Sequence, residues 1–393
     1  MTKSQEFIEM EHQYGAHNYH PLPVVLSKGE GAFVWDVEGK KYFDFLSAYS
    51  AVNQGHCHPK IVKALCDQAQ TLTLTSRAFY NDCLGPYEKY ITDYFKYDKV
   101  LPMNTGAEAD ETAMKLARRW GYRVKGIEED KAIIVCCEGN FHGRTISIVS
   151  MSTDPDSYGQ FGPFTPGFIK IPYNDSKALE AVLEKHGKDI VYVPDDGYLK
   201  TCYDLCKKHN VLFIADEVQT GIARTGKLLA CEHEGVRPDV LILGKALSGG
   251  VIPVSAVLAD DEVMLTIGPG EHGSTFGGFC LAGKVAMAAL EVVKEEKLAE
   301  RAEYLGKIFR DEMAKVKSDM IELVRGKGLL NAIVIRPKNG KEAWDVCLKM
   351  RDLGVLAKPT HGHIIRFAPP IVISEEDLRK AIELIKEAIL SFE

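Results

Sequence analysis

Short runs of apolar residues alternate with amphipathic stretches through the middle of the chain. Three of these runs, 132–136 (AIIVC), 211–215 (VLFIA) and 240–243 (VLIL), are rich in β-branched residues. Near-continuous apolar runs are typical of parallel strands that helices cover on both faces. Helical patterns over 178–185 and 198–209 lie between the runs. The alternation predicts a doubly wound α/β domain.

The pattern changes after about residue 281. Residues 281–317 are rich in Ala, Glu, Lys and Leu and predict one long or broken helix. The elements expected after it are a strand, a helix, a strand and a terminal helix, over 329–335, 343–353, 364–367 and 375–390. This order predicts a smaller α+β domain.

The N-terminal part carries alternating apolar residues and glycine turns over 19–45, which predict a hairpin packed on that smaller domain. We therefore expect three parts. They are an N-terminal segment (1–60) that packs with the small domain, a large α/β domain (61–285) and a small C-terminal α+β domain (286–393).

Composition and charge exclude several classes of protein. With 46% hydrophobic and 26% charged residues, the 393-residue chain has the balance of a globular protein rather than a disordered one. The net charge is −7 and no block of Lys and Arg occurs, so we expect no nucleic-acid partner. No apolar run reaches the ~18 residues that span a bilayer, so we expect no membrane partner.

The N-terminus and the cysteines bear on the compartment. Residues 1–11 are polar and acidic, unlike a secretory signal or a basic mitochondrial presequence. We expect a cytoplasmic protein, or one of the mitochondrial matrix if a presequence has been removed. The ten cysteines form no CxxC pair, and the His56/His58 and His361/His363 pairs have no placed carboxylate. We expect no metal.

Candidate chemistry lies where the predicted strands end. Asp216 follows the second apolar run, and Lys245 follows the third. Phe141, His142 and Arg144 follow the first run after a short turn. Because ligands of open parallel sheets bind at the carboxyl ends of the strands, we expect these side chains to converge.

A fourth element is the sequence Asn-Thr-Gly-Ala-Glu at 104–108, which opens a predicted helix over 109–120. Thr105 and Glu108 have the spacing of a capping box, and Gly106 allows close approach of a ligand to the backbone. A helix start of this kind can hold a phosphate. No GxxxxGK[ST] motif occurs, so nucleoside triphosphate chemistry is not favoured.

Together these parts meet the needs of pyridoxal 5′-phosphate, which requires a lysine, an acid at its ring nitrogen, a phosphate cup and usually a stacked aromatic ring. Each part alone has an ordinary structural explanation, such as a solvated lysine or a helix cap. Their combination in this order supports the cofactor.

Longer motifs around these residues resemble the ornithine δ-aminotransferases, which are subgroup-III aminotransferases of pyridoxal-phosphate fold type I. The resemblance covers nearly the whole chain. The motifs that carry it are YGAHNY (14–19), LSAYSAVNQGHCHP (46–59), NTG (104–106), IADEVQTG (214–221), LGKALSGG (243–250), GEHGST (270–275) and RFAPP (366–370). The fold implied is α/β, with a mixed, mostly parallel sheet in a large cofactor-binding domain and a smaller α+β domain.

The resemblance implies roles around the cofactor ring. Lys245 is the lysine that binds pyridoxal 5′-phosphate and moves the proton, and Asp216 pairs with the ring nitrogen. Gln219 lies near the ring hydroxyl, and Val218 and Phe141 lie on either face of the ring.

The resemblance also implies a cofactor site shared by two subunits of a homodimer. Gly106 and Ala107 hold the phosphate, together with Ser274 and Thr275 of the partner subunit. His142 stands beside the cofactor, where the family usually has a Trp.

For the substrates, the resemblance implies that Arg144 binds the α-carboxylate of L-ornithine, which Tyr19 and Tyr49 orient. Arg366 binds the second carboxylate of 2-oxoglutarate, as expected for a planar guanidinium that pairs with a carboxylate through two hydrogen bonds. The implied products are glutamate 5-semialdehyde and glutamate, which connect arginine metabolism with proline biosynthesis. An N-acetylornithine or 4-aminobutyrate aminotransferase remains an alternative.

One segment of the family is absent. Members of the family carry the segment Glu-Pro-(Ile/Val)-Gln-Gly-Glu-Ala-Gly, which supplies a sheet strand and an acid that neutralises the arginine corresponding to Arg366. At the same place, this chain runs from Ile190 directly into Val191. Either these residues are missing only from the part of the protein that a structure covers, or the chain is a catalytically impaired homologue that has lost them. We expect the former, because losing a central strand would leave ladder groups of its neighbours unpaired.

Overall fold

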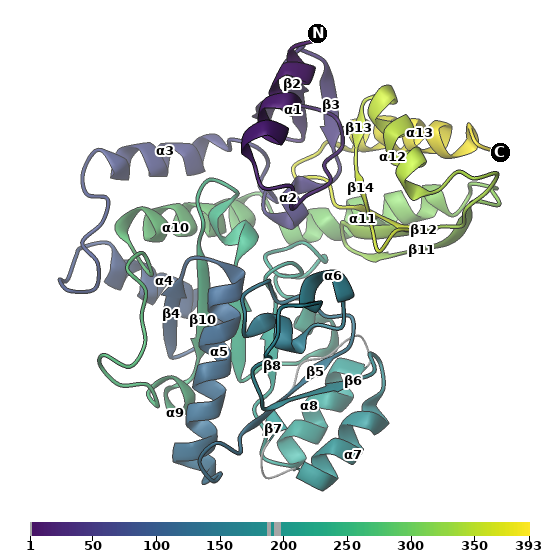
Figure 1. Cartoon of the computed structure of the whole chain (residues 1–393). Helices are drawn as coiled ribbons and strands as arrows, with labels where there is room; N and C mark the ends of the chain where they lie inside the picture. The colour runs from purple at the N-terminus through teal and green to yellow at the C-terminus, as the bar shows by residue number, and fades with distance from the viewer. Residues whose placement is uncertain (1, 187–189, 192–197) are drawn as a thin grey trace.

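The structure, a computed structural model of the whole chain, describes residues 2–186, 190–191 and 198–393. Figure 1 shows two bodies. The sheets formed by the middle of the chain lie in one body, and most of the C-terminal strands and helices lie in the other. The N-terminal strands lie beside the second body.

The main sheet of the large body has four strands in the order β4-β10-β9-β8. Their bounds are β4 Lys99–Met103, β10 Ser255–Ala259, β9 Val240–Leu243 and β8 Ile214–Asp216. β8 and β9 are parallel, whereas β10 is antiparallel to both of its neighbours, so the sheet is mixed. Every residue of β9 and β10 is buried, as their apolar sequences predict. The strand expected over 211–215 forms, but β8 begins only at residue 214.

A second, three-stranded parallel sheet has the order β6-β5-β7. It consists of β6 (Phe168–Ile171), β5 (Ile133–Cys137) and the two-residue strand β7 (Ile190–Val191). Within the described residues, no hydrogen-bonded ladder joins β7 to β8. The strands of the large body therefore form two sheets instead of one continuous sheet.

This break corrects our expectation about the absent segment. The full 393-residue sequence lacks the segment, and Ile190 and Val191 pair as neighbours with Ile133 and Ile134. The segment is therefore absent from the chain and not only from its structure, so that expectation is wrong.

Helices cover both sheets. α5 (Gly106–Trp120) packs against β9 and β10, and α10 (Cys280–Glu295) packs against α3 (Pro59–Ala69) and α4 (Leu84–Phe95). The helices predicted over 178–185 and 198–209 form as α7 (Ser176–His186) and α8 (Tyr198–Lys208), which pack against each other. The short elements are α6 (Pro155–Tyr158), α9 (Asp261–Met264), η1 (Gly121–Lys125), η2 (Ile148–Met151), η3 (Ala230–Glu234) and η4 (Lys245–Ser248).

The long helix predicted over 281–317 is broken in two. α10 ends at Glu295, and α11 (Leu298–Met313) begins after Lys297, whose φ of +51° is left-handed and cannot continue a helix. The elements that follow confirm the α+β prediction. They are β11 (Ile321–Lys327), β12 (Leu330–Ile335), α12 (Ala343–Leu353), β14 (Lys358–Thr360), β15 (Ile364–Phe367) and α13 (Glu375–Leu390).

The N-terminal part forms more than the expected hairpin. After α1 (Lys3–Tyr14), the strands β1 (Leu26–Glu30), β2 (Phe33–Asp36) and β3 (Lys41–Asp44) form an antiparallel meander. β3 also pairs in parallel with β13 (Val355–Leu356), so this sheet joins the two ends of the chain. The boundaries proposed at residues 60 and 285 stay a prediction.

A buried arginine links the three regions. The guanidinium of Arg224 donates hydrogen bonds to the Asn53 side chain and to the carbonyl oxygens of Leu329 (3.1 Å) and Pro369 (2.7 Å). Its side chain has no exposed surface. No helix among residues 2–186 and 198–393 combines the length and the apolarity needed to cross a bilayer.

Candidate active site

Lys245 lies directly after the buried strand β9 and opens the turn η4. Its φ of +43° is a left-handed conformation that a side chain rarely adopts, and such strain clusters at functional sites. Burial lowers the pKa of Lys245, which the charges of Asp216 and Asp110 partly offset, and the charge of Arg366 lowers it further. A lowered pKa leaves more of the amine neutral, as a nucleophilic lysine requires.

Asp216 is the last residue of β8 and lies opposite Ile242 of β9, so β8 and β9 end side by side. One carboxylate oxygen accepts a hydrogen bond from the Val218 amide (3.0 Å), and the other lies 2.9 Å from Nδ1 of His142. Burial raises the pKa of Asp216, but the hydrogen bond and charge of His142 outweigh it and lower the pKa. The acid is thus held ionised, as the role predicted for it beside a protonated ring nitrogen requires.

His142 also faces a second acid. Its Nδ1 lies 3.5 Å from an oxygen of Asp110, which belongs to the first turns of α5. Burial opposes protonation of the imidazole, but its contacts with Asp110 and Asp216 raise the pKa of His142 well above its usual value. Burial and the charge of Asp216 raise the pKa of Asp110 to about 7.

These three side chains have the donor types of a metal site, and one donor atom of each lies within 4.8 Å of the others. The 2.9 Å separation of Asp216 and His142 is shorter than the ~3.3 Å expected between two ligands on a tetrahedral ion, and it suits a hydrogen bond. We interpret the cluster as hydrogen-bonded and ionic, and the absence of a metal stays a prediction.

The start of α5 forms the predicted capping box. The Glu108 amide donates to Thr105 Oγ1 (3.2 Å), and the Thr105 amide donates to the Glu108 carboxylate (3.0 Å). The first amides of a 15-residue helix, at Gly106 and Ala107, are available to an anion. Asn104 Nδ2 donates to Ser274 Oγ of the same chain (2.8 Å), and the buried Asn104 Oδ1 has no partner among the described residues.

Val218 lies between the helix start and the lysine turn. A Cβ atom added to Gly106 or to Gly244 would meet the Val218 side chain at 3.2 Å. Glycine at both positions therefore lets the two backbone segments approach the same valine. This agrees with a valine that supports one face of a flat ligand between a phosphate cup and Lys245.

Tyr49 lies on a left-handed turn that the sequence did not reveal. All four residues of Ser47–Ser50 (α2) have φ between 46° and 74°. Gln219 Nε2 donates a hydrogen bond to the Tyr49 carbonyl oxygen (3.2 Å). Burial lowers the pKa of Arg366, and the charge of Tyr49 offsets part of this decrease. Gln219, Tyr49 and Arg366 are thus brought to the same side of the site.

The remaining predicted substrate residues are more exposed. Tyr19 and Phe141 have exposed fractions of 72% and 63%, and the guanidinium of Arg144 lies 5.8 Å from the centre of the Phe141 ring. No described interaction joins Tyr19 to Lys245. Thr275 is exposed and follows Ser274. The structure of one chain therefore does not unite these residues with the buried part of the site.

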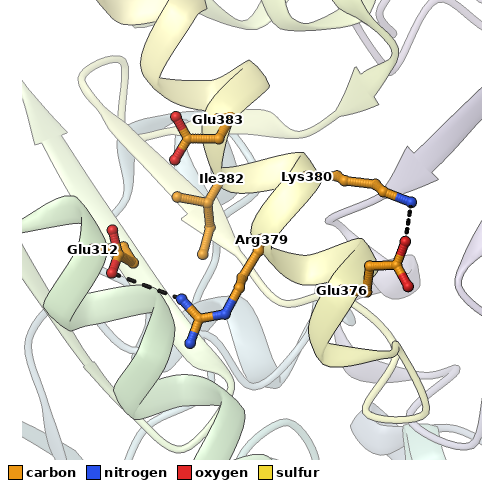
Figure 2. Close-up of a pocket in the computed structure, with 6 residues that line it drawn as sticks. All are labelled: Glu312, Glu376, Arg379, Lys380, Ile382 and Glu383. Atoms are coloured by element: carbon orange, nitrogen blue, oxygen red, sulfur yellow. Dashed lines mark hydrogen bonds and ion pairs between the residues drawn. The ribbon is translucent and has the colours of Figure 1, made fainter.

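The cavity drawn in Figure 2 is unrelated to this cluster. It has a volume of about 350 Å³ and lies between α11 and α13 of the small body. Its charged walls pair with one another, as Arg379 does with Glu312 and Lys380 with Glu376. Mutual pairing of this kind is typical of a solvated surface.

The sequence analysis missed Asp110. Asp110 lies on the buried face of α5, which also carries Ala113 three positions later and Ala117 seven positions later. An acid on the apolar face of a helix, just after a predicted phosphate cup, was the available signal.

The donor set fits pyridoxal 5′-phosphate. The site combines a half-buried lysine, an ionised aspartate at the end of the neighbouring strand and a helix start that can bind an anion. Val218 lies against Gly106 of that helix start and against Gly244 next to the lysine, and Asn104 Oδ1 is a buried polar atom without a partner among the described residues. The fold and site together define a pyridoxal-phosphate-dependent transferase of fold type I.

Residues 14–389 match the family Aminotransferase class-III, so the chain belongs to the class-III aminotransferases. It is 62% identical to "Ornithine aminotransferase, mitochondrial" of Rattus norvegicus, covering 99% of this chain and 91% of the rat protein. Their alignment spans 401 positions, eight more than this chain has residues, so the rat protein carries residues without a counterpart here.

Solved structures agree in fold. The ornithine aminotransferase of Toxoplasma gondii superposes with a TM-score of 0.96 at 47% identity, covering 100% of this chain and 96% of that chain. A structure titled acetylornithine aminotransferase from Elizabethkingia anophelis has a TM-score of 0.92 at 63% identity and covers 100% of both chains.

Proposed function

We propose that the chain is an ornithine δ-aminotransferase. It moves the δ-amino group of L-ornithine to 2-oxoglutarate and gives glutamate 5-semialdehyde and glutamate. The observation that carries this proposal is the placement of Lys245 and Asp216 after two adjacent strands, close enough for the charge of Asp216 to raise the pKa of Lys245, in a chain 62% identical to a curated ornithine aminotransferase.

Pyridoxal 5′-phosphate would be held by Lys245, Asp216, Val218, Gly106 and Ala107. When bound, this cofactor supplies an electron sink that stabilises negative charge at the carbon next to the substrate nitrogen. The ionised Asp216 keeps a ring nitrogen protonated by its charge. The neutral amine of Lys245 would take the proton from Cδ of ornithine as a general base and then, as a general acid, deliver it to the cofactor instead of back to Cδ.

The carboxylates of the two substrates require separate cations. Arg144 binds the carboxylate of ornithine at the outer, exposed end of the site, and Tyr19 and Tyr49 orient the chain so that its δ-amino group reaches the cofactor. Arg366, half-buried and close enough to Lys245 to lower its pKa, binds the carboxylate of 2-oxoglutarate nearest the reacting carbon. No acid among the described residues pairs with Arg366.

The same residues would serve N-acetylornithine, which remains the second candidate because of the 63% identical Elizabethkingia structure. The two substrates differ at one end, where N-acetylornithine carries an amide in place of an amine. With the purified protein and 2-oxoglutarate, we expect kcat/KM for ornithine to exceed that for N-acetylornithine or 4-aminobutyrate at least tenfold. A higher value for N-acetylornithine would make it the substrate.

The absent segment suggests a further outcome of this assay. A protein that binds pyridoxal 5′-phosphate but turns over none of the three amines would be the catalytically impaired homologue that we considered from the sequence. Retention of Lys245, Asp216 and both arginines supports an active enzyme instead.

We also propose a homodimer, in which Ser274 and Thr275 of one subunit complete the phosphate cup of the other. Ser274 reaches Asn104 within its own chain, and the exposed Thr275 is available to a second subunit. The compartment stays as predicted, the cytoplasm or alternatively the mitochondrial matrix, the latter supported by relatives named mitochondrial. Sedimentation at micromolar concentration and cell fractionation test the two statements.

A further inference from the structure

Asp110 is a buried carboxylate that the proposed reaction does not use. Only 5% of the residue is exposed, and it lies on the face of α5 that packs into the protein. Aspartate is almost never fully buried unless it is paired. Among the described residues, the ion pair that Asp110 forms is with His142.

One imidazole nitrogen of His142 faces the carboxylates of both Asp216 and Asp110. His142 Nδ1 lies 2.9 Å from Asp216 and 3.5 Å from Asp110, and the side chains of all three are at most 15% exposed. A proton on Nδ1 is donated to Asp216, because 2.9 Å is a hydrogen-bond distance and 3.5 Å is not. Asp110 therefore acts on His142 through its charge more than through a hydrogen bond.

We propose that Asp110 is a positioning residue of the active site, which keeps His142 protonated and gives the group of Asp110, His142 and Asp216 a net negative charge opposite the cofactor ring. The inference rests on the proposed function in one respect, namely that Asp216 faces the ring nitrogen. The coupling between Asp110 and His142 is a property of the chain alone.

The charge count explains why a second acid is needed. A protonated His142 neutralises Asp216, and the pair alone offers no net charge to a protonated ring nitrogen. With Asp110 ionised, the three groups carry a net charge of −1. The charged groups that face Asp110 are His142, Asp216 and Lys245, and Asp110 also raises the pKa of Lys245.

A purely structural role would have different consequences. If Asp110 only filled space in α5, the nearly isosteric Asp110→Asn would leave the titration of His142 unchanged. If Asp110 acts by charge, the same change removes the charge and keeps the shape. Asp36→Asn serves as the matched control, because Asp36 is also buried (8% exposed) but lies in β2. It accepts hydrogen bonds from the Tyr42 hydroxyl and from the amides of Glu38 and Lys40, and none from a histidine.

The test is an NMR titration of histidine in the cofactor-free protein, with the His142 signal assigned by its loss in His142→Gln. We expect His142 to titrate at the highest pH of the chain's histidines, and Asp110→Asn to lower its proton affinity at least tenfold. Asp36→Asn should have no effect. In the loaded protein, we expect Asp110→Asn to weaken binding of pyridoxal 5′-phosphate and to move the pH midpoint of the bound cofactor's absorption to lower pH.

A His142 titration that is equal in wild type and in folded Asp110→Asn would overturn the proposal. If Asp110→Asn does not fold, the wild type alone decides, because an ordinary proton affinity of His142 would also refute it. Failure of the proposed function looks different. Wild-type protein would then not transaminate ornithine, while the titration of the cofactor-free protein would still respond to Asp110.

Discussion

The two halves of the candidate site differ in how one chain supports them. The cofactor half lies at strand ends and at the start of α5 inside the large body. There, burial and the charges of neighbouring groups shift the pKa values of Lys245, Asp216 and Asp110. The substrate half rests on exposed side chains, including Tyr19 at 72% and Phe141 at 63% exposed.

The difference indicates which steps depend on a single chain. Strands pack their ends together whether or not a ligand is present, so the chemistry of Lys245 and Asp216 is organised in advance. We expect the exposed side chains to gain fixed positions from the second subunit of the proposed homodimer or from substrate. Changes in the cofactor half should therefore affect the chemical step, and changes in the substrate half should affect the recognition of one substrate.

The largest effect is expected from Lys245→Ala. The variant loses both the cofactor attachment and the group that moves the proton, and general acid–base catalysis alone contributes about 10²–10⁴-fold. We expect kcat to fall at least that far in a steady-state assay with ornithine. Lys227→Ala, at an exposed lysine of the same body, should leave kcat unchanged. A Lys245→Ala enzyme with more than a tenth of the activity would contradict the assignment.

Asp216→Asn should have the next largest effect. The amide keeps the shape but removes the charge opposite the ring nitrogen, and loss of one such electrostatic partner costs about 10²–10³-fold in rate. The variant should still bind the cofactor, since Lys245 and the start of α5 remain. Bound cofactor with near-normal turnover would show that Asp216 has another role.

A smaller and more selective effect is expected for Arg366→Ala. It should weaken 2-oxoglutarate by ~2–4 kcal/mol, the range for truncating one partner of a buried charge pair, and affect ornithine much less. Stopped-flow measurements of the two half-reactions separate these effects. Arg379→Ala, at the unrelated cavity of Figure 2, is the control. Equal losses in both halves would mean that the two arginines do not divide the substrates.

The smallest effect concerns stability without the cofactor. Folding raises the pKa of Asp110 from 3.8 to about 7, so the native state binds this proton more tightly than the unfolded state. Asp110 therefore costs stability progressively as the pH rises from about 4 to about 7. Urea unfolding at pH 5 and pH 7.5 should show wild type losing stability relative to Asp110→Asn. The opposite trend would mean that the attraction between Asp110 and His142 outweighs the burial of Asp110 and its repulsion by Asp216.

Local patterns predicted much of the fold. The run at 240–243 forms β9 with those bounds, and the capping box of Thr105 and Glu108 forms as expected, because both depend on neighbouring residues. The sequence allowed for a break in the helix over 281–317 but did not place it at Lys297, and the left-handed turn at Ser47–Ser50 was not predicted.

The site was predictable in part for the same reason. Lys245 and Asp216 follow apolar strands whose ends must meet, whereas Asp110 is recognised only when α5 is placed beside His142. The break between β7 and β8 was also hidden, because pairing between distant strands cannot be read from one segment. The site roles taken from the family resemblance stay predictions until the variants are measured.

The central claim is that Lys245, organised by one chain, carries the cofactor. Borohydride reduction of the protein loaded with pyridoxal 5′-phosphate, followed by peptide mapping, tests it directly. We expect one label per chain, on the peptide that contains Lys245. A label on another lysine, or a loaded protein that takes up none, would contradict the account.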